Sequence, residues 1–261
     1  MSGHDAEPGA YDPPQPRSAA DRLLSVLDAF DFDHPALTLT EISRRADLPL
    51  PTAHRVVAAL ARWGALERDG SGAYHIGLRL WEVATLAPRG LGLRQAALPF
   101  LEDLYETTHE NVQLAVRDGF EVLFIERIFG QSAVGVRTRV GGRWPLHATG
   151  VGLALLAHAD RAVVDEVCGS LQASYTPYTI TDPVHLRRVL ADVRATGCAV
   201  SDRQITDDAV SVAAPVFGPH GDVVAAVSVV APVRTTQPHA LVPVVRLAAR
   251  GISRALGRPQ R

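Results

Sequence analysis

Residues 38–63 restrict the fold of this chain most, because they predict two short helices joined by a tight turn. Thr38 and Glu41 form a capping box at the start of the first helix. The turn is Asp47-Leu48-Pro49. Pro51 suits the first turn of the second helix, because its missing N–H would have no partner there. This is the spacing of a helix-turn-helix unit.

The second helix has two unlike faces when its residues are placed 100° apart. One face is an apolar stripe that ends at Trp63. Exposed helix faces usually mix acidic and basic side chains, but the opposite face here carries no carboxylate: Pro51, His54, Arg55, Ala58 and Arg62. Residues 38–62 hold four arginines against two carboxylates, so this face is suited to phosphates and base edges.

A helix capped by Ser18 and two short strands around an Asp-Gly-Ser-Gly turn flank this unit. Three helices followed by a ribbon is the order of a winged helix-turn-helix, whose third helix enters the DNA major groove. Small three-helix units also serve as protein-interaction modules, which would have no affinity for DNA. We predict a disordered tail over 1–17, a DNA-binding domain over 18–80 and a linker over 81–92.

The remaining residues, 93–261, predict a second domain of mixed structure. Strict alternation of apolar residues indicates strands, and a 3.6-residue period indicates helices. The expected strands are 111–117, 121–128, 133–140, 210–217 and 223–231, and the expected helices are 92–108, 148–159, 183–197 and 239–257. The fold class expected for the whole chain is therefore α+β.

Catalytic motifs are missing from the sequence. It has no Gly-x-Ser-x-Gly elbow, no Gly-x-x-x-x-Gly-Lys loop and no Gly-x-Gly-x-x-Gly after a strand. Its ten histidines show no metal-binding spacing. Cys168 and Cys198 fit reduced thiols, and Cys198 begins an apolar strand, so core packing suits it better than a nucleophilic role. We predict no enzyme, no metal and no cofactor.

Charge and hydropathy exclude other classes. The formal net charge is −2 and all 26 basic residues are arginine, which suits phosphate and carboxylate recognition. The longest apolar run, around Val223–Val233, is far below the ~20 residues of a membrane span. We expect a cytoplasmic protein without a membrane partner.

Several motifs resemble one family. "LTLTEISRRADLPLPTAHRVVAALARWGAL" resembles the DNA-binding segment of the IclR family of bacterial transcriptional regulators, with its Leu-Thr-Glu-Ile-Ala box and Thr-x-His-Arg-Leu-Leu helix. "GGRWPLHATGVGLALLA", "GCAVSD", "VAAPVF" and "GDVVAAVSVVAP" are similar to motifs of its second domain, in the same order. The resemblance spans residues 18 to about 257.

The resemblance implies a repressor or activator with a GAF-like effector domain built on a curved antiparallel sheet. It implies a homodimer or tetramer on a pseudo-palindromic double-stranded operator, whose affinity is modulated by a small organic acid, often aromatic. Together with the exposed face of the second helix, it gives these candidate DNA contacts: Arg44, Arg45, Thr52, His54, Arg55, Arg62 and Arg68.

The start of the helix at Thr149-Gly150 offers free N–H groups and a positive dipole end, which suit a carboxylate. The alternative is that Thr149 only caps its own helix and His147 only packs in the loop. Carried over from the family position by position, the candidate effector-binding residues are Leu146, His147, Ala148, Thr149, Gly150, Ser201, Asp202, Ser211 and Ser228.

The chain also departs from the family pattern. The family's turn glycine is Asp47 here, a residue type that tolerates the left-handed conformation better than most. Its Lys-Ser pair is Leu50-Pro51, which removes one phosphate contact and one capping hydroxyl, so the operator should differ from the family's commonest one. Leu153 replaces a lysine, and Val230 replaces a strand serine and makes the pocket more apolar.

A different class of function stays open at this point. An enzyme domain fused to a DNA-binding module would share the first domain and differ in the second. Turnover of candidate ligands would separate it from a regulator.

Overall fold

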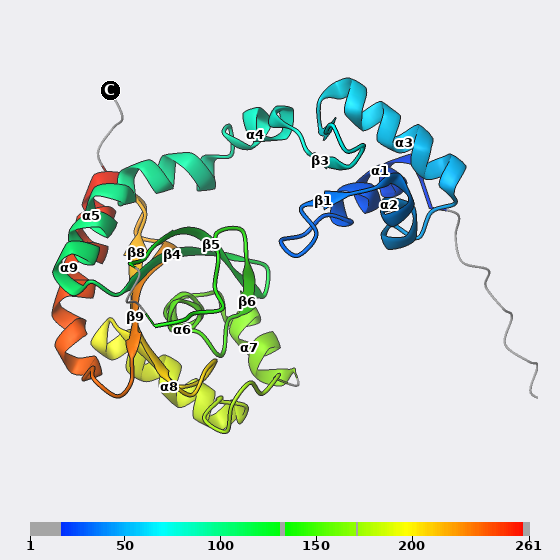
Figure 1. The fold of residues 1–261 in the computed structure, drawn as a ribbon. Helices are drawn as coiled ribbons and strands as arrows, with labels where there is room; N and C mark the ends of the chain where they lie inside the picture. Colours follow the sequence, from blue (N-terminus) through cyan, green and yellow to red (C-terminus); the bar gives the residue numbers. More distant parts are fainter. Residues whose placement is uncertain (1–16, 131–133, 171, 258–261) are drawn as a thin grey trace, which may run out of the picture. The chain divides into compact units, whose positions relative to one another are not determined.

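The computed structural model describes residues 17–130, 134–170 and 172–257. The chain divides into two compact units, one ending at Ala87 and the other beginning at Pro88 (Figure 1). Residues 1–16 of the expected tail lie outside the described residues.

The first unit holds three helices, a small sheet and a fourth helix. Their bounds are α1 (Ala19–Asp28), β1 (Ala36–Leu37), α2 (Leu39–Arg45), α3 (Leu50–Trp63), β2 (Leu66–Arg68), β3 (Tyr74–Ile76) and α4 (Leu78–Ala84). Both predicted capping boxes are present, at Ser18 and at Thr38. The strands are antiparallel in the order β1-β3-β2, so the ribbon that follows α3 gains a third, short strand.

The turn between α2 and α3 depends on one unusual backbone conformation. Asp47 has a φ of 52°, in the left-handed region that the family pattern fills with glycine. The Asp47 carboxylate accepts a hydrogen bond from Nη2 of Arg17 at 3.1 Å. Asp47 thus takes the left-handed conformation that its residue type tolerates better than most.

The second unit holds a six-stranded antiparallel sheet and five α-helices among its described residues. Its elements are a π-helical turn η1 (Pro88–Gly92), α5 (Leu93–Thr108), β4 (Asn111–Asp118), β5 (Glu121–Ile128), β6 (Arg143–Pro145), α6 (Gly150–Ala157), α7 (Arg161–Gly169), α8 (Pro183–Thr196), β7 (Ala199–Asp202), β8 (Ala209–Phe217), β9 (Val223–Pro232) and α9 (Pro238–Leu256). The strand order is β6-β5-β4-β9-β8-β7.

The two faces of this sheet cover separate cores. Alternate residues of β4, β8 and β9, such as Leu114, Val212 and Val227, pack against α5 and α9. The other face packs against α6, α7 and α8, and the sheet curves around α6 (Figure 1). All eight residues of α6 are buried, because this helix is apolar around its whole circumference. The predicted curved antiparallel sheet is therefore confirmed.

Two glycines let the start of α6 approach its neighbours. A Cβ on Gly150 would lie 2.6 Å from the Ser211 hydroxyl on β8, and a Cβ on Gly152 would lie 2.4 Å from the Leu146 carbonyl oxygen. Gly152 requires glycine because the Leu146 oxygen belongs to the backbone, whereas a Cβ on Gly150 would force the Ser211 hydroxyl to move.

The strand expected at 133–140 is wrong for its described part, because residues 134–140 form an irregular segment. The sheet bonds that the pattern suggested are replaced by side-chain bonds. Nδ2 of Asn111 donates to the carbonyl oxygen of Val134 at 2.9 Å, and Nη1 of Arg127 donates to that of Thr138 at 2.9 Å. Across the described ranges, we find no helix with the length and hydrophobicity that crossing a lipid bilayer requires.

Candidate functional site

The α3 helix separates a buried stripe from an exposed basic face. Ala53 and Val57 on the stripe are buried. His54, Arg55 and Arg62 on the opposite face are exposed. Within the described part of the chain, Arg62 forms no hydrogen bond or ion pair, and Nε of Arg55 bonds only the carbonyl oxygen one turn earlier. This face can therefore give its cations to an outside partner.

The N-terminus of α3 has no side-chain cap, because Pro49 occupies the N-cap position. Thr52, in the first turn, is half-buried. The sequence placed the missing capping hydroxyl at Leu50-Pro51, whereas the N-cap of α3 is Pro49, one residue before that pair.

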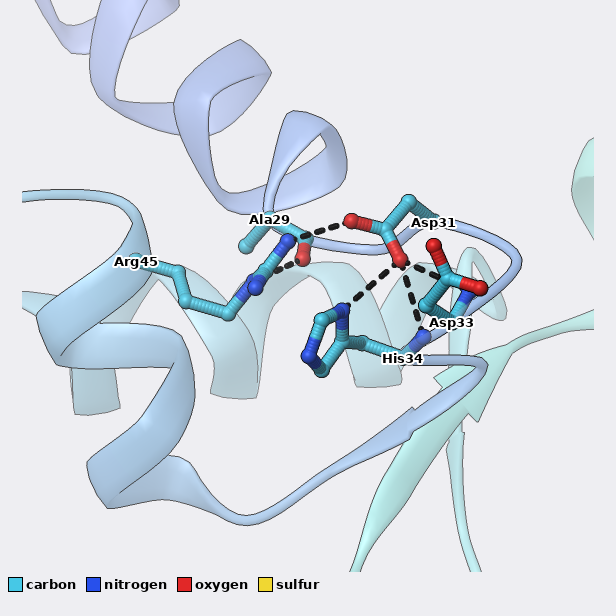
Figure 2. Close-up of polar contacts among 5 residues, drawn as sticks. All are labelled: Ala29, Asp31, Asp33, His34 and Arg45. Carbon is cyan, nitrogen blue, oxygen red and sulfur yellow. Dashed lines mark hydrogen bonds and ion pairs between the residues drawn. The ribbon is translucent and has the colours of Figure 1, made fainter.

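The neighbouring arginines of α2 have different surroundings. Arg44 is exposed and has no hydrogen bond or ion pair to any described residue. Arg45 donates from Nε to the Ala29 carbonyl oxygen at 2.6 Å and pairs through Nη2 with the Asp31 carboxylate at 2.5 Å (Figure 2). The Asp31 carboxylate also accepts a hydrogen bond from Nδ1 of His34 at 2.8 Å. Arg45 thus ties the end of α1 to the end of α2.

The ribbon that follows α3 is braced at its tip. Oδ1 of Asp69 accepts hydrogen bonds from the backbone of Ser71 and Ala73. Arg68 donates from Nε to the Gly72 carbonyl oxygen at 3.1 Å, and its guanidinium lies 5.6 Å from the centre of the Tyr74 ring. Arg68 remains exposed, so it can meet a phosphate from this fixed position.

The second unit contains a cavity of about 50 Å³ between the sheet face that carries α6 and two irregular segments. It has room for a compact molecule, since one water needs roughly 10–15 Å³ of such space. It is lined by Gln113, Phe124, Val136, Arg137, Thr138, Thr149, Gly150, Val151, Ser201, Gln204, Ile205, Thr206, Ala209, Ser211 and Val230.

Four of the predicted effector-binding residues meet at this cavity: Thr149, Gly150, Ser201 and Ser211. Val230, predicted to supply an apolar wall, lines it as well. Oγ1 of Thr149 accepts a hydrogen bond from the Gly152 N–H at 3.0 Å. Thr149 is therefore a helix cap that also faces the cavity, and its hydroxyl hydrogen stays available to a ligand.

The other predicted residues do not line the cavity. Leu146 and Ala148 are buried in the core. Asp202 forms an ion pair with the neighbouring Arg203. Ser228 is fully buried on β9, opposite Gln113 of β4, and its hydroxyl has no partner among the described residues.

His147 is buried beside the cavity loop. Its Nε2 lies 2.9 Å from the carbonyl oxygen of Ala173, and its ring stacks on that of Tyr175. Burial lowers the pKa of His147, so the imidazole is neutral near pH 7 and can donate from Nε2.

Sequence reasoning missed the lining residues that other elements supply. Gln113 reaches the cavity through its place on β4, and Arg137 reaches it from the irregular segment that we expected as a strand. Gln204 comes from a turn whose carbonyl oxygens accept hydrogen bonds from Thr176 and Thr179. No local signal marks these residues, because the sheet register and long-range bonds bring them together.

The structure offers little support for metal or thiol chemistry. No cluster of three or more potential metal ligands occurs among the described residues. Cys198 is buried, donates from Sγ to the Ala213 carbonyl oxygen at 3.1 Å, and has a pKa raised by burial to about 11. It stays a thiol near pH 7, whereas a nucleophile must be a thiolate.

Two family models match the chain. The model described as "Bacterial transcriptional regulator IclR C-terminal" matches residues 86–254, and the model described as "IclR helix-turn-helix domain" matches residues 19–70.

Two curated relatives are similar over most of their length. The HTH-type transcriptional regulator BhcR of Paracoccus denitrificans is 35% identical over 216 residues, or 82% of this chain and 77% of that protein. The HTH-type transcriptional regulator KipR of Bacillus subtilis is 33% identical over 209 residues, or 80% of this chain and 83% of that protein.

One solved structure carries a small molecule. The crystal structure of an IclR homolog from Microbacterium hydrocarbonoxydans, complexed with 4-hydroxybenzoate, is similar with a TM-score of 0.88 at 41% identity. The match covers 92% of this chain and 99% of that chain.

Proposed function

This chain belongs to the IclR family of bacterial transcriptional regulators, and we propose that its second domain binds a small organic acid that changes its affinity for DNA. The chain is a DNA-binding regulator with a helix-turn-helix domain. The observation that carries the proposal is the cavity, because it combines hydroxyl donors with an apolar wall next to the start of α6. Such a mixture suits a compact ligand with one polar end.

The relative that binds 4-hydroxybenzoate supports the class of ligand. Its chain matches almost all of this one. Thr149 and Ser211 supply hydroxyl groups, while Phe124 and Val151 supply apolar surface that fits an aromatic ring. The effector in this proposal is therefore a carboxylic acid, and an aromatic ring would pack against the apolar side of the cavity.

The DNA contacts follow from the exposed face of α3. Arg55 reads a base edge near the N-terminal end of the helix, while His54, Thr52 and Arg62 lie along the same groove. Arg44 and Arg68 contact phosphates. Both are exposed cations, and they lie on α2 and β2, the elements directly before and after α3 in the chain. Arg45 contacts a phosphate less directly, because its bonds to Asp31 and Ala29 already occupy part of its guanidinium group.

The protein acts as a homodimer or tetramer on a pseudo-palindromic operator, because one winged domain covers too few base pairs for selectivity. Helices α4 and α5 provide the contact. The apolar side chains of Leu78 and Trp81 on α4 are 70% and 62% exposed, and Leu86 just beyond it is 80% exposed. Large apolar side chains that are exposed within one short segment suit an interaction site.

The second domain binds its ligand without transforming it, and the protein acts in the cytoplasm, where the bacterial operators are. The alternative is an enzyme domain attached to a DNA-binding module. Incubation of the protein with each acid that binds, followed by chromatography of the mixture, separates the two. Unchanged ligand supports the regulator, and a time-dependent product supports the enzyme.

A calorimetric titration tests the binding proposal. Full-length protein is titrated with 4-hydroxybenzoate, benzoate and short aliphatic acids, each with its amide as an uncharged control. We expect at least one acid to bind with a single site per chain and more tightly than its amide. Binding of no acid in the panel would contradict the proposal.

A further inference from the structure

The described side chains that line the cavity of the second domain carry positive charge and no negative charge. Arg137 is the one charged side chain among the described residues that line it, and none of these residues carries a carboxylate. An anion therefore meets one cation and no carboxylate among these lining residues. From this we infer that Arg137 is the residue that selects anionic effectors, by pairing its guanidinium with the ligand carboxylate. The inference rests on the proposed function, since it names the charge-selecting group of the same site.

Arg137 lies at the rim of the cavity, because it lines the cavity and is also exposed. Within the described residues its guanidinium makes no hydrogen bond or ion pair. Elsewhere in this domain, arginines such as Arg94 and Arg143 are paired with carboxylates. A guanidinium presents a rigid fork of donors that matches a carboxylate in two parallel bonds.

The wall of the cavity fixes the orientation of such a ligand. Phe124 and Val151 are 1% exposed, so they lie in its buried part. Their apolar side chains suit a ring, whereas a carboxylate there would lose its hydration without a cation. The ring therefore points inward and the carboxylate points to the rim, where Arg137 lies. The hydroxyl of Thr149 adds a hydrogen bond to a polar group of the ligand, without distinguishing an acid from an amide.

The segment that carries Arg137 is held by buried and half-buried side chains of the sheet. Before Arg137, Nδ2 of Asn111 donates to the Val134 carbonyl oxygen at 2.9 Å. After it, Arg127 donates to the Thr138 carbonyl oxygen at 2.9 Å, and the Gln113 amide donates to the Thr138 hydroxyl.

These anchors are joined to one another. Nη2 of Arg127 donates to Oδ1 of Asn111 at 2.8 Å, so a single network holds both ends of the segment. Asn111 is fully buried and Gln113 is 2% exposed, which makes the network expensive to break. Arg127 is thus a positioning residue, which acts on the ligand through Arg137.

The test measures two ligands against two variants by calorimetry on the full-length protein. The ligands are 4-hydroxybenzoate and 4-hydroxybenzamide, which share the ring and differ in charge. The variants are Arg137→Gln and the matched control Arg139→Gln. The control removes the same charge two residues further along the chain, at a position that does not line the cavity.

We expect Arg137→Gln to weaken binding of the acid about tenfold, which is the lower end for a hydrogen bond to a charged group. Binding of the amide should change less than twofold, and Arg139→Gln should leave both ligands unaffected. Equal weakening of acid and amide, or no weakening of the acid, would overturn the role of Arg137 while leaving the proposed function intact. If the wild-type protein prefers another acid of the panel, that acid and its amide replace the pair. Failure of the wild-type protein to bind any acid would instead overturn the proposed function, and this inference with it.

The positioning role has its own readout. Arg127→Gln leaves Arg137 in the chain but releases the Thr138 end of its segment. The ratio of acid affinity to amide affinity should therefore fall toward the value for Arg137→Gln. Arg127→Lys keeps the charge but cannot make both bonds, so it should restore little of that ratio. An unchanged ratio in a folded Arg127→Gln protein would show that Arg127 does not position Arg137.

Discussion

The Arg45 guanidinium pairs through Nη2 with the Asp31 carboxylate at 2.5 Å, and its Nε donates at the same time to the carbonyl oxygen of Ala29 at 2.6 Å (Figure 2). Adjacent arginines of α2 therefore have different tasks, because Arg44 has no such bonds within the described residues.

We expect Arg45→Ala to destabilise the N-terminal unit by about 1 kcal/mol, through the lost hydrogen bond to Ala29. Arg44→Ala should leave the free energy of unfolding unchanged and weaken binding to all DNA sequences alike. Urea denaturation and a salt series of DNA titrations check the pair. Equal stability of the two variants would show that the Arg45 bonds carry no folding energy.

Arg55→Ala tests the assignment of the recognition helix. Arg55 is exposed near the start of α3, so its loss should cost about 1–3 kcal/mol of operator affinity and relax the preference at one base position. Binding to a library of operator variants gives both quantities. Unaltered affinity and preference would mean that this face of α3 does not read the DNA.

Asp47 tests the turn before α3. Its φ of 52° costs an ordinary residue about 1–2 kcal/mol. Asp47→Ala should therefore destabilise the N-terminal unit by about 1 kcal/mol, while Asp47→Gly should be neutral or stabilising. Thermal denaturation of the two variants decides the matter, and a less stable Asp47→Gly protein would show that the Arg17 contact outweighs the backbone strain.

Features that depend on residues close together in the chain could be predicted from the sequence. The capping boxes at Ser18 and Thr38 depend on neighbours within a few residues, and both are present as expected. The burial of α6 follows from its uniform hydropathy in the same way.

The strand expected at 133–140 shows the limit. Its alternating side chains fit a half-buried segment, but its carbonyl groups accept hydrogen bonds from Asn111 and Arg127, which lie on other strands 23 and 11 residues away from the residues that they bind. The pairing of β4 within the sheet likewise brings Gln113 to the cavity, whereas Asp202 follows the cavity residue Ser201 on β7 and so faces the other way. The motif around Thr149 therefore gave Thr149 and Gly150 of the cavity, and most of the other lining residues depend on the assembled sheet.

Acid should destabilise the second domain. Burial lowers the pKa of His147 and of His158 below the ordinary value of 6.5. Below about pH 6.5 these histidines are therefore protonated more readily in the unfolded chain than in the folded one. Their contribution to the free energy of unfolding is complete above that pH and is lost as the pH falls below it. The slope reaches at most ~1.4 kcal/mol per pH unit for each histidine. Denaturation of wild type and His147→Gln between pH 5 and pH 8 should give a shallower slope for the variant. Identical slopes would exclude a contribution from His147.

If a ligand in the cavity changes DNA affinity, DNA binding must respond to an acid that the protein binds. The full-length protein is titrated onto a DNA fragment that it enriches from bacterial genomic DNA, with and without an acid that calorimetry shows to bind. Wild type and Thr149→Val are compared, because the variant removes a hydroxyl from the cavity and from the cap of α6. We predict that the acid shifts the Kd for DNA in wild type. The variant should bind DNA normally without ligand and need roughly threefold to tenfold more acid for the same shift. A Kd that no bound acid alters would contradict the account, and loss of both activities in Thr149→Val would reduce Thr149 to a structural cap.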